Sequence, residues 1–410
     1  MQPAARSVRA VNRLTARWAA GGGAAPEGAA LSAATLWPLL GFLASAADGP
    51  ARDELEDAVG LPAAEAAGAA RCFIEALGSL RGTRTALGLW TRAGFPLDAA
   101  WTAGLPAGTH GTFLGDQAAD RERLDAWVAE ATGGLVSDMP VRIEKDTELV
   151  LAAAQTLRTR WLRPFVETVV ECDTGPWRGR ALRGLCRTTS VLDRVAVADT
   201  LDGPLTVLKV LGTTDVDVHL CMGADGMPPD RVLCHGIGTL TGAGSPVPGD
   251  RLADGAPGPG VLVYTQRRQT PEPELQVLTV PFRVEARHDL LRRPAPFGLS
   301  TASDPSRGHF PGIGPEPLAV GTAGHTALAV FDAEGFEAAS VTALGAVAGG
   351  APRPPRYSVR VVEVTFDRPF AFLAVHRTSR LVLSAGWVVD PLPFTGFGEH
   401  GDDSWDEDDH

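Results

Sequence analysis

Three polar residues, Asp215, Asp217 and His219, alternate along an apolar stretch and form the most chemically suggestive set in the chain. Alternate residues of a strand point to the same face, so a strand here would align two carboxylates with an imidazole. Such groups can bind a metal, but a closed tetrahedral site needs a further ligand, and none is assignable from the sequence. The pattern therefore favours a solvated strand face, and we expect no metal site.

Nucleophilic catalysis has equally little support. Cys234 and His235 are neighbours in the sequence, which does not place a thiol and an imidazole in catalytic geometry. The chain also has no Gly-x-Ser-x-Gly sequence, the turn that presents the nucleophile of many hydrolases. We therefore predict that the protein is not an enzyme and uses no cofactor.

Charge and hydropathy narrow the range of partners. The net charge of −12 argues against a nucleic acid or an anionic membrane surface as partner. Seven acidic residues lie in the segment 392–410, which we expect to be a disordered, solvated tail, and they leave −5 on the rest of the chain. No uninterrupted apolar run reaches the roughly 18 residues that a membrane-spanning helix needs.

Cysteine usage indicates the compartment. The five cysteines are dispersed without Cys-x-x-Cys spacing, which predicts reduced thiols instead of a disulfide framework. The N-terminal residues also lack the uninterrupted apolar core of a secretion signal. We expect a cytoplasmic protein on these grounds.

Helical spacing of apolar residues marks the first third of the chain, and strand-like runs dominate the rest. The expected helices cover 11–19, 35–46, 51–59, 71–80 and 118–131. The expected strands cover 84–91, 148–158, 204–211, 215–222, 261–265, 276–286, 325–331, 360–366, 370–376 and 381–389. Helices followed by strands favour an α+β fold over alternating βαβ units.

The segment from His325 to Thr342 joins an apolar strand-like run to Gly335 and a run of small residues. Small side chains bury little area, so they suit a segment that slides into a narrow slot. Other patterns accompany it in order: Leu31-Ser32-Ala33-Ala34-Thr35-Leu36, Leu124-Asp125-Ala126-Trp127-Val128 with Thr132-Gly133-Gly134, Trp161-Leu162-Arg163-Pro164-Phe165, and Arg368-Pro369-Phe370. Together they resemble the serpins, the serine protease inhibitor superfamily, and a divergent, bacterial-type member of it.

The resemblance implies a single serpin-like domain over 1–391, with about eight to nine helices around three β-sheets and an exposed reactive loop at about 335–360. In this family a protease cleaves the loop and forms an acyl-enzyme through its own serine. The N-terminal part of the loop then inserts as a new strand in the main sheet and distorts the protease. The resemblance therefore implies a serine protease as partner, a monomeric inhibitor without catalytic groups, and an extracellular location as the alternative.

The residues of the hinge carry the insertion. The resemblance assigns this role to Gly335, Phe336, Glu337, Ala338, Ala339, Ser340 and Thr342. Strand alternation turns Phe336 inward, where inhibitory members have Thr or Ser, and overpacking an interior costs roughly 1–3 kcal/mol. We expect Phe336 to slow the start of insertion, and Ala333 in place of the family's glutamate is a second departure. The small residues that follow keep an insertable pattern.

The cleaved bond is ambiguous, because the loop is roughly nine residues longer than the family's usual spacing. Counting forward from Gly335 places the bond near Gly349-Gly350, and counting back from Pro369 places it near Ser358. Arg353 precedes a proline, which resists most serine proteases, so Arg356-Tyr357 is the better trypsin-like site. The alternative is that the two arginines only solvate the loop.

The resemblance also names residues that let the main sheet open. It places Ser32, Thr35 and His325 in a polar cluster under the sheet, and Trp161 where the loop enters it. A buried histidine needs partners for both nitrogens, which the two hydroxyls could help supply. The family's asparagine falls at Ala153, and Gln155 is the candidate replacement.

Two functions remain open from the sequence. The first is inhibition of a serine protease, with a trypsin-like enzyme favoured by Arg356. The second is a non-inhibitory serpin fold that binds a ligand or a protein, or is only a protease substrate. Phe336, Ala153, Ala333 and the long loop favour the second function, whereas the small-residue hinge and Arg356 favour the first.

Overall fold

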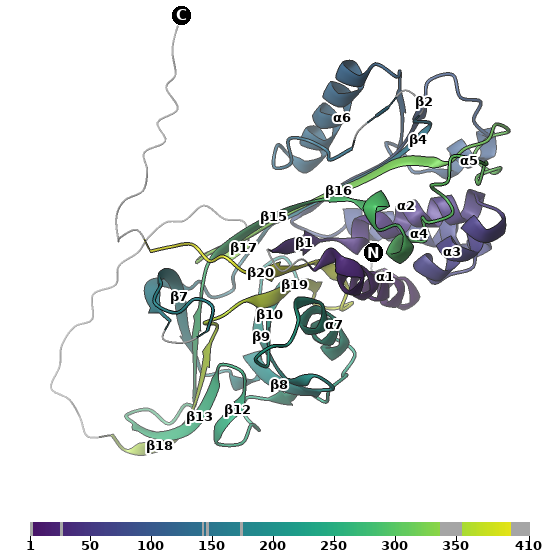
Figure 1. The fold of residues 1–410 in the computed structure, drawn as a ribbon. Helices are drawn as coiled ribbons and strands as arrows, with labels where there is room; N and C mark the ends of the chain where they lie inside the picture. The colour runs from purple at the N-terminus through teal and green to yellow at the C-terminus, as the bar shows by residue number, and fades with distance from the viewer. Residues whose placement is uncertain are drawn as a thin grey trace, which may run out of the picture.

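The computed structural model describes residues 3–24, 28–141, 143–144, 147–172, 175–336 and 355–394. This part of the chain contains seven α-helices (Figure 1), fewer than the eight to nine expected. They are α1 (Ala5–Trp18), α2 (Ala33–Ala46), α3 (Gly49–Val59), α4 (Ala63–Gly78), α5 (Ala99–Gly104), α6 (Gln117–Thr132) and α7 (Pro229–Thr239). The α+β class is confirmed, with three β-sheets beside the helices.

The main sheet contains Gly335 and Phe336, the first two of the expected hinge residues. Its strands are β2 (Thr83–Arg92), β3 (His110–Phe113), β4 (Leu149–Leu157), β5 (Thr159–Arg160), β15 (Phe282–Asp289), β16 (Val320–Phe331) and β17 (Gly335–Phe336). Its central strands β4 and β16 run parallel. A strand that turns back from the end of β16 and enters between them must run antiparallel to its neighbours, as β17 does to β16 and β5.

The second sheet, called here the buried sheet, forms the centre of the molecule. Its order is β1-β20-β19-β10-β9-β8-β11. The strands are β1 (Ala29–Leu31), β8 (Val195–Thr200), β9 (Gly203–Val210), β10 (Val216–Gly223), β11 (Val247–Pro248), β19 (Phe370–His376) and β20 (Val382–Val388). Every residue of β10, β19 and β20 is buried, so this sheet belongs to the main hydrophobic core.

The third sheet, called here the end sheet, has the order β12-β13-β18-β14-β7-β6. Its strands are β6 (Val166–Glu171), β7 (Ala181–Thr189), β12 (Gly255–Gly258), β13 (Val261–Arg268), β14 (Glu274–Thr279) and β18 (Tyr357–Thr365). The chain that leaves β20 packs along this sheet, since Phe394 donates its backbone N–H to Ala181 of β7 over 3.1 Å. The rest of the acidic tail, 395–410, lies outside the described residues.

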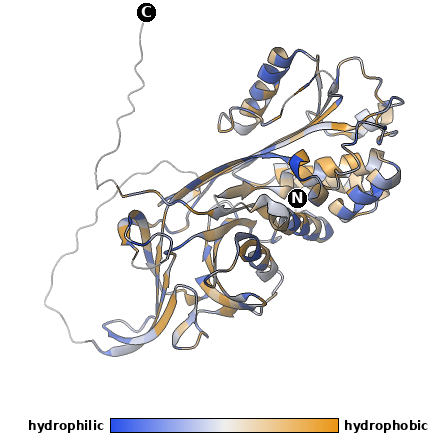
Figure 2. Cartoon of the chain, in the orientation of Figure 1, coloured by the Kyte–Doolittle hydropathy of each residue, from blue (hydrophilic) through white to orange (hydrophobic). Residues whose placement is uncertain are grey.

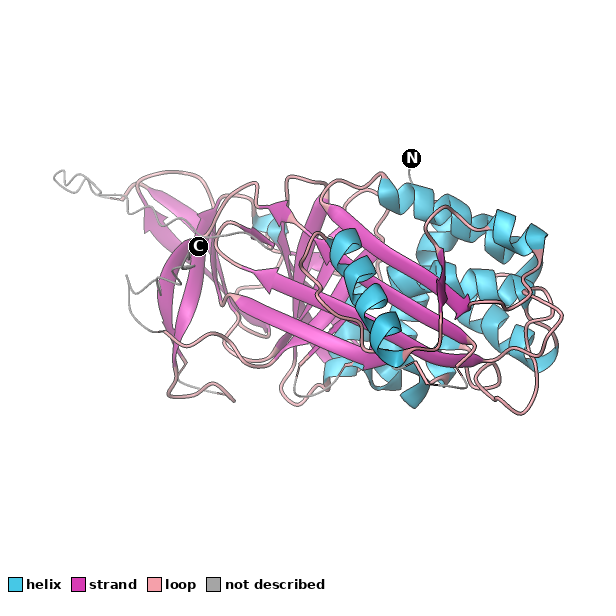
Figure 3. Ribbon diagram, turned by 90° about the horizontal axis from the view of Figure 1, so that it is seen from above, coloured by secondary structure: helices cyan, strands magenta, loops and turns pink. Residues whose placement is uncertain are grey.

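The helices position the main sheet by hydrophobic packing. Nearly every residue of α2 is buried, and Figure 2 shows hydrophobic residues concentrated on the helices around it. Gly41 lets α2 cross α4 closely, because a Cβ there would lie 3.2 Å from the Ala66 carbonyl oxygen. On the other face, α6 lies across the long strands (Figure 3), and Leu124 and Val128 contribute to a smaller core there. No helix within the described ranges is long and apolar enough to cross a membrane.

Two details of the strands expected from the sequence are corrected. The run 276–286 is two strands, β14 in the end sheet and β15 in the main sheet, because Pro281 cannot donate a backbone hydrogen bond and interrupts the pairing. The strands β6, β7 and β8 were not expected. Strands β6 and β7 contain polar and half-exposed residues and lack the apolar alternation that marks a strand in a sequence, and only the first four residues of β8 are apolar and buried.

Candidate functional site

The candidate site lies at the end of the main sheet where β16 turns back into β17. Asp332 shapes this turn, because its carboxylate accepts the backbone N–H groups of Glu334 at 2.8 Å and Gly335 at 2.9 Å. Its own backbone N–H donates to the Gly335 carbonyl at 3.0 Å. A Cβ at position 335 would lie 2.4 Å from the Thr159 carbonyl oxygen, so only glycine allows this approach.

The strand β17 is a short insertion between two neighbours. Gly335 and Phe336 pair with β5 on one side, and Phe336 pairs with Phe331 of β16 on the other. Beyond this point β4 and β16 pair directly with each other, over residues 149–155 and 320–327. The sheet is therefore open for two hinge residues and closed further along. The remaining hinge residues lie outside the described part of the chain: Glu337, Ala338, Ala339, Ser340 and Thr342.

Phe336 is buried under the open end of the sheet, with 1% of its surface exposed. Its ring centroid lies 6.1 Å from that of Phe372 in the buried sheet. The same cluster contains Phe282, which stacks on Phe331 at 5.2 Å and on Phe372 at 5.2 Å. The structure thus places Phe336 inward and gives its ring a prepared aromatic site, which sequence reasoning treated only as overpacking.

Trp161 donates two hydrogen bonds to the backbone of the turn. Its indole N–H donates to the Asp332 carbonyl at 2.9 Å, and its backbone N–H donates to the Glu334 carbonyl at 2.8 Å. The ring is buried, lies 4.8 Å from that of Phe331, and its residue forms a β-bridge with Gly212. This tryptophan therefore joins the turn to the aromatic cluster and to the chain below it.

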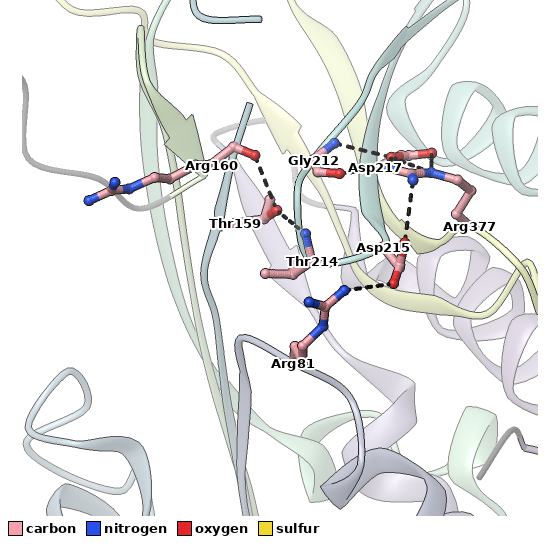
Figure 4. A network of polar contacts seen from close by, with 8 residues as sticks. All are labelled: Arg81, Thr159, Arg160, Gly212, Thr214, Asp215, Asp217 and Arg377. Carbon is pink, nitrogen blue, oxygen red and sulfur yellow. Dashed lines mark hydrogen bonds and ion pairs between the residues drawn. The ribbon is translucent and has the colours of Figure 1, made fainter. Parts of the chain in front are cut away.

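Near the open end of the main sheet, ion pairs join Arg377 to Asp217 and Asp215 (Figure 4). Nη2 of Arg377 lies 2.6 Å from Oδ1 of Asp217 and also donates to the Gly212 carbonyl at 2.6 Å. Asp215 contacts Arg377 at 3.4 Å and Arg81 at 3.0 Å. The hydrogen bond to Asp217 raises the pKa of Arg377, so the guanidinium stays charged. Through Gly212 this network supports the tryptophan of the turn.

The network corrects the expectation of a solvated face at Asp215, Asp217 and His219. Asp217 and His219 are buried, and Asp215 precedes β10 with a positive φ of 63°. Desolvation, followed by the charge of Lys209, lowers the pKa of His219 to about 4, so this imidazole is neutral. No cluster of three or more metal-ligating side chains occurs among the residues that the structure describes.

The polar cluster under the centre of the sheet differs from the expectation. Ser32 donates to the Gln155 side-chain oxygen at 2.5 Å and lies 2.7 Å from the Leu383 carbonyl, while Thr35 donates to the Ser32 carbonyl at 3.0 Å. Neither hydroxyl bonds His325, so the expected pairing with this imidazole is wrong. Gln155 takes a place in the cluster, but as the partner of Ser32.

His325 is fully buried, and both of its ring nitrogens lack a hydrogen-bond partner within the described structure. Its ring makes an edge contact with Trp18 at 5.0 Å and lies 5.9 Å from the ring of His288. Desolvation, and secondarily the charge of His288, holds the pKa of His325 well below its usual range. This histidine therefore packs as a neutral ring, in direct register with Ala153 of β4.

The C-terminal end of the expected reactive loop leads into β18 of the end sheet. Arg356 precedes β18 and donates its backbone N–H to the Arg268 carbonyl at 2.9 Å, and Tyr357 is the first residue of β18. Both residues are exposed. Sequence reasoning missed the pairing with Arg268, although the apolar run at 261–265 signalled a strand. The other candidate bait residues lie outside the described residues: Gly349, Gly350 and Arg353.

Comparisons with known proteins agree with this architecture. A family model described as serpin (serine protease inhibitor) matches residues 264–391. Human thyroxine-binding globulin complexed with thyroxine superposes with a TM-score of 0.71 and 15% identity, over 95% of this chain and 99% of that chain. The thermophilic serpin tengpin superposes with a TM-score of 0.71 and 12% identity, over 93% of this chain and 94% of that chain. The protein has the serpin fold.

Relatives by sequence also support the serpin superfamily. Serpin-Z12 of Oryza sativa subsp. japonica is 28% identical over 402 residues, which cover 92% of this chain and 88% of its own length. Serpin-Z6C of the same plant is 27% identical over 299 residues, 68% of this chain and 66% of its own length, just under two thirds. These relatives are from a plant, so they give no support to the expected bacterial type. Serpins are generally protease inhibitors rather than enzymes.

The buried aromatic contacts of Phe336 give a first prediction. Replacing Phe336 with Ala should release β17 from the sheet, because truncating a buried Phe costs about 3 kcal/mol or more. We expect amide hydrogen exchange at Gly335 and Phe336 to accelerate by about a hundredfold, the equivalent of that energy. Phe336→Met, which keeps most of the apolar volume, should remain close to the parent. Unchanged exchange in Phe336→Ala would contradict this seat.

The buried histidine gives a second prediction, on pH. Because the pKa of His325 is depressed in the folded protein, its contribution to stability is complete above the unfolded value of about 6.5 and is lost as pH falls below it. His325→Phe keeps an edge-packed ring and removes both unpaired nitrogens. We expect its unfolding free energy to fall about 2 kcal/mol less between pH 7 and pH 5 than that of the parent. Urea unfolding at the two pH values measures this, and parallel losses would refute it.

Proposed function

We propose that this protein inhibits a serine protease by suicide trapping. The protease's serine attacks the reactive loop and forms an acyl-enzyme, after which the loop's N-terminal part inserts between β4 and β16 and carries the protease with it. The observation that carries the proposal is the seat of Gly335 and Phe336, the first two residues of such a strand, between β16 and β5. No group of this protein takes part in the bond chemistry.

The register of β17 supports further insertion. Phe336 pairs with Phe331, so an antiparallel strand continued along β16 brings residues near 346 and 347 level with Val320, the first residue of β16. The same continuation along β4 reaches Leu149. About eleven more residues, spanning about 36 Å, would fill the sheet. The pairs between β4 and β16 must part to admit them.

The composition of the loop fits that path. Because Phe336 points inward, alternation turns a set of five later residues inward as well: Ala338, Ser340, Thr342, Leu344 and Ala346. None of these five side chains is charged, so none leaves an unpaired charge beneath the sheet. Glu337, the one charged residue between 336 and 347, belongs to the outward set.

The choice of cleaved bond affects the target. The depth of the sheet supports Gly349-Gly350, because a strand that ends near residue 347 leaves this bond just outside. Arg356-Tyr357 would suit a trypsin-like enzyme, but the Arg356 backbone already bonds Arg268. A protease binds its substrate as an extended strand, so this pairing obstructs cleavage there. We therefore favour Gly349-Gly350 and a protease with a small specificity pocket, with a trypsin-like enzyme as the other candidate.

The decisive experiment mixes the purified protein with trypsin and, separately, with an elastase-type protease. We expect a complex that survives SDS, cleavage located by mass spectrometry at Gly349-Gly350, and a cleaved form that melts far above the native one. A complex formed with cleavage at Arg356-Tyr357 would support the inhibitory function and would assign the cleaved bond there instead. Clean cleavage without a complex and without a rise in melting temperature would refute the function.

Charge placed on the two faces of the loop gives a matched test of insertion. Ala338→Glu would bury a carboxylate beneath the sheet, whereas Ala339→Glu would place it outward. We expect Ala338→Glu to turn the inhibitor into a substrate, with the yield of SDS-stable complex falling at least about tenfold, as a burial cost above about 1.4 kcal/mol implies. Ala339→Glu should retain most of the complex. Equal yields from the two variants would contradict the inward assignment.

One observation favours a second function, ligand binding without inhibition. A cavity of about 1410 Å³ opens beyond the far end of β16, lined among others by Trp18, Arg287, His288 and Thr322. Thyroxine-binding globulin, a structural neighbour, is named for binding thyroxine, and its 15% identity supports only a shared fold. This function gains weight if the protease experiment gives cleavage alone.

A further inference from the structure

The strand that follows the reactive loop, β18, is enclosed within the end sheet. On one side it faces β13, with eight antiparallel pairs from Arg268–Tyr357 to Val261–Val364. On the other side, five parallel pairs join it to β14. The strand therefore has no free edge along most of its length.

The two flanking strands are consecutive in the chain. Only residues 269–273 connect β13 to β14, so this connection passes around the Tyr357 end of β18. An ion pair between Arg268 and Glu274, 3.1 Å apart, joins the two strands across the same end. The chain of the reactive loop thus enters the sheet through a closed frame, with the Arg356 backbone bonded to Arg268 at its entrance.

Side chains strengthen the frame on the β13 side. The Tyr264 hydroxyl donates to the Glu363 carboxylate at 2.6 Å, which links β13 to β18. Arg360 of β18 bonds the segment that precedes β12, with Asp254 at 3.1 Å and the Gly249 carbonyl at 3.3 Å. Releasing β18 would break these contacts together with the backbone pairs on both sides.

The frame around β18 limits the insertion of an intact loop, because the loop has a fixed length. Full insertion places residue 347 about 36 Å along the sheet from Phe336. An intact loop would then have to return to Tyr357 in about ten steps, which reach at most about 36 Å. The returning chain must span the full length of the inserted segment and also the distance from β17 to β18. The strand β18 lies beyond the end of the main sheet that holds β17 (Figure 1). Insertion without cleavage therefore requires β18 to leave its frame.

We propose that β13 acts as a clamp on β18 and thereby makes insertion of the reactive loop depend on cleavage. The inference rests on the proposed function, because it presumes that the main sheet accepts the loop. Cleavage frees the N-terminal part of the loop from β18, so the clamp does not hinder trapping. The uncleaved protein keeps its loop exposed because the clamp blocks the alternative route.

A pair of proline variants tests the clamp. Thr365 donates to the Gly260 carbonyl at 2.9 Å, and hydrogen-bonded pairs recur at every second residue of an antiparallel ladder. Gln266 therefore belongs to a hydrogen-bonded pair with β18, and its neighbour Thr265 does not. Gln266→Pro removes one ladder donor to β18, and Thr265→Pro is the matched control at an equally exposed position of the same strand.

Each full-length variant is incubated at a raised temperature below its melting point, and its intact mass and melting curve are followed over time. We expect Gln266→Pro to form an uncleaved, high-melting species about tenfold faster than the parent and Thr265→Pro, the change that corresponds to losing one sheet hydrogen bond. Tyr264→Phe, which removes the bond to Glu363 without altering the backbone, should shift the rate in the same direction.

The possible outcomes distinguish a failure of the clamp from a failure of the proposed function. Equal conversion rates in Gln266→Pro, Tyr264→Phe and the parent would overturn the clamp alone, provided that protease-cleaved parent protein gains its high melting temperature. If the cleaved parent gains no stability, the proposed function fails first and the clamp falls with it. Faster conversion in both variants, with Thr265→Pro unchanged, supports the clamp.

Discussion

The main sheet holds a strand of two residues, Gly335 and Phe336, at a place where its neighbours could accept about eleven more. This short strand is held because the Phe336 ring fills an aromatic site, while Asp332 and Trp161 bind the backbone of the turn that leads to it. A hinge held in this way enters the sheet in one register. The direction and the alternation of any further insertion are therefore determined before a protease arrives.

Apolar spacing predicted five of the seven described α-helices, although α1 and α4 begin earlier than expected. The two that it missed are α5, a single short segment, and α7, where Gly236 and Gly238 interrupt the spacing. Gly335 and the small residues after it marked the hinge. Contacts between distant segments, such as Arg377 with Asp217 or β13 with β18, were beyond reach, because the sequence does not show which strand edges meet.

The cluster under the centre of the sheet illustrates the same limit and has a physical consequence. Sequence reasoning assigned the wrong hydrogen-bond partners, since Ser32 bonds Gln155 of β4 and both ring nitrogens of His325 in β16 lack a partner among the described residues. Parting β4 from β16 at this level therefore breaks backbone pairs and packing, but no hydrogen bond of the imidazole. Gln155 and Ser32 can stay together on the β4 side while β16 moves away.

The two ends of the reactive loop are held with very different strength. At the hinge, two residues pair with the main sheet, whereas at the other end β18 has eight pairs with β13 and five with β14. If the intact loop came under tension, the few pairs of Gly335 and Phe336 would break before the longer ladders of β18. A loop that releases its hinge stays outside the sheet, where a protease can reach it. In the proposed mechanism, cleavage separates the two ends, so Gly335 and Phe336 keep their register beside β16 and β5 and lead the strand inward.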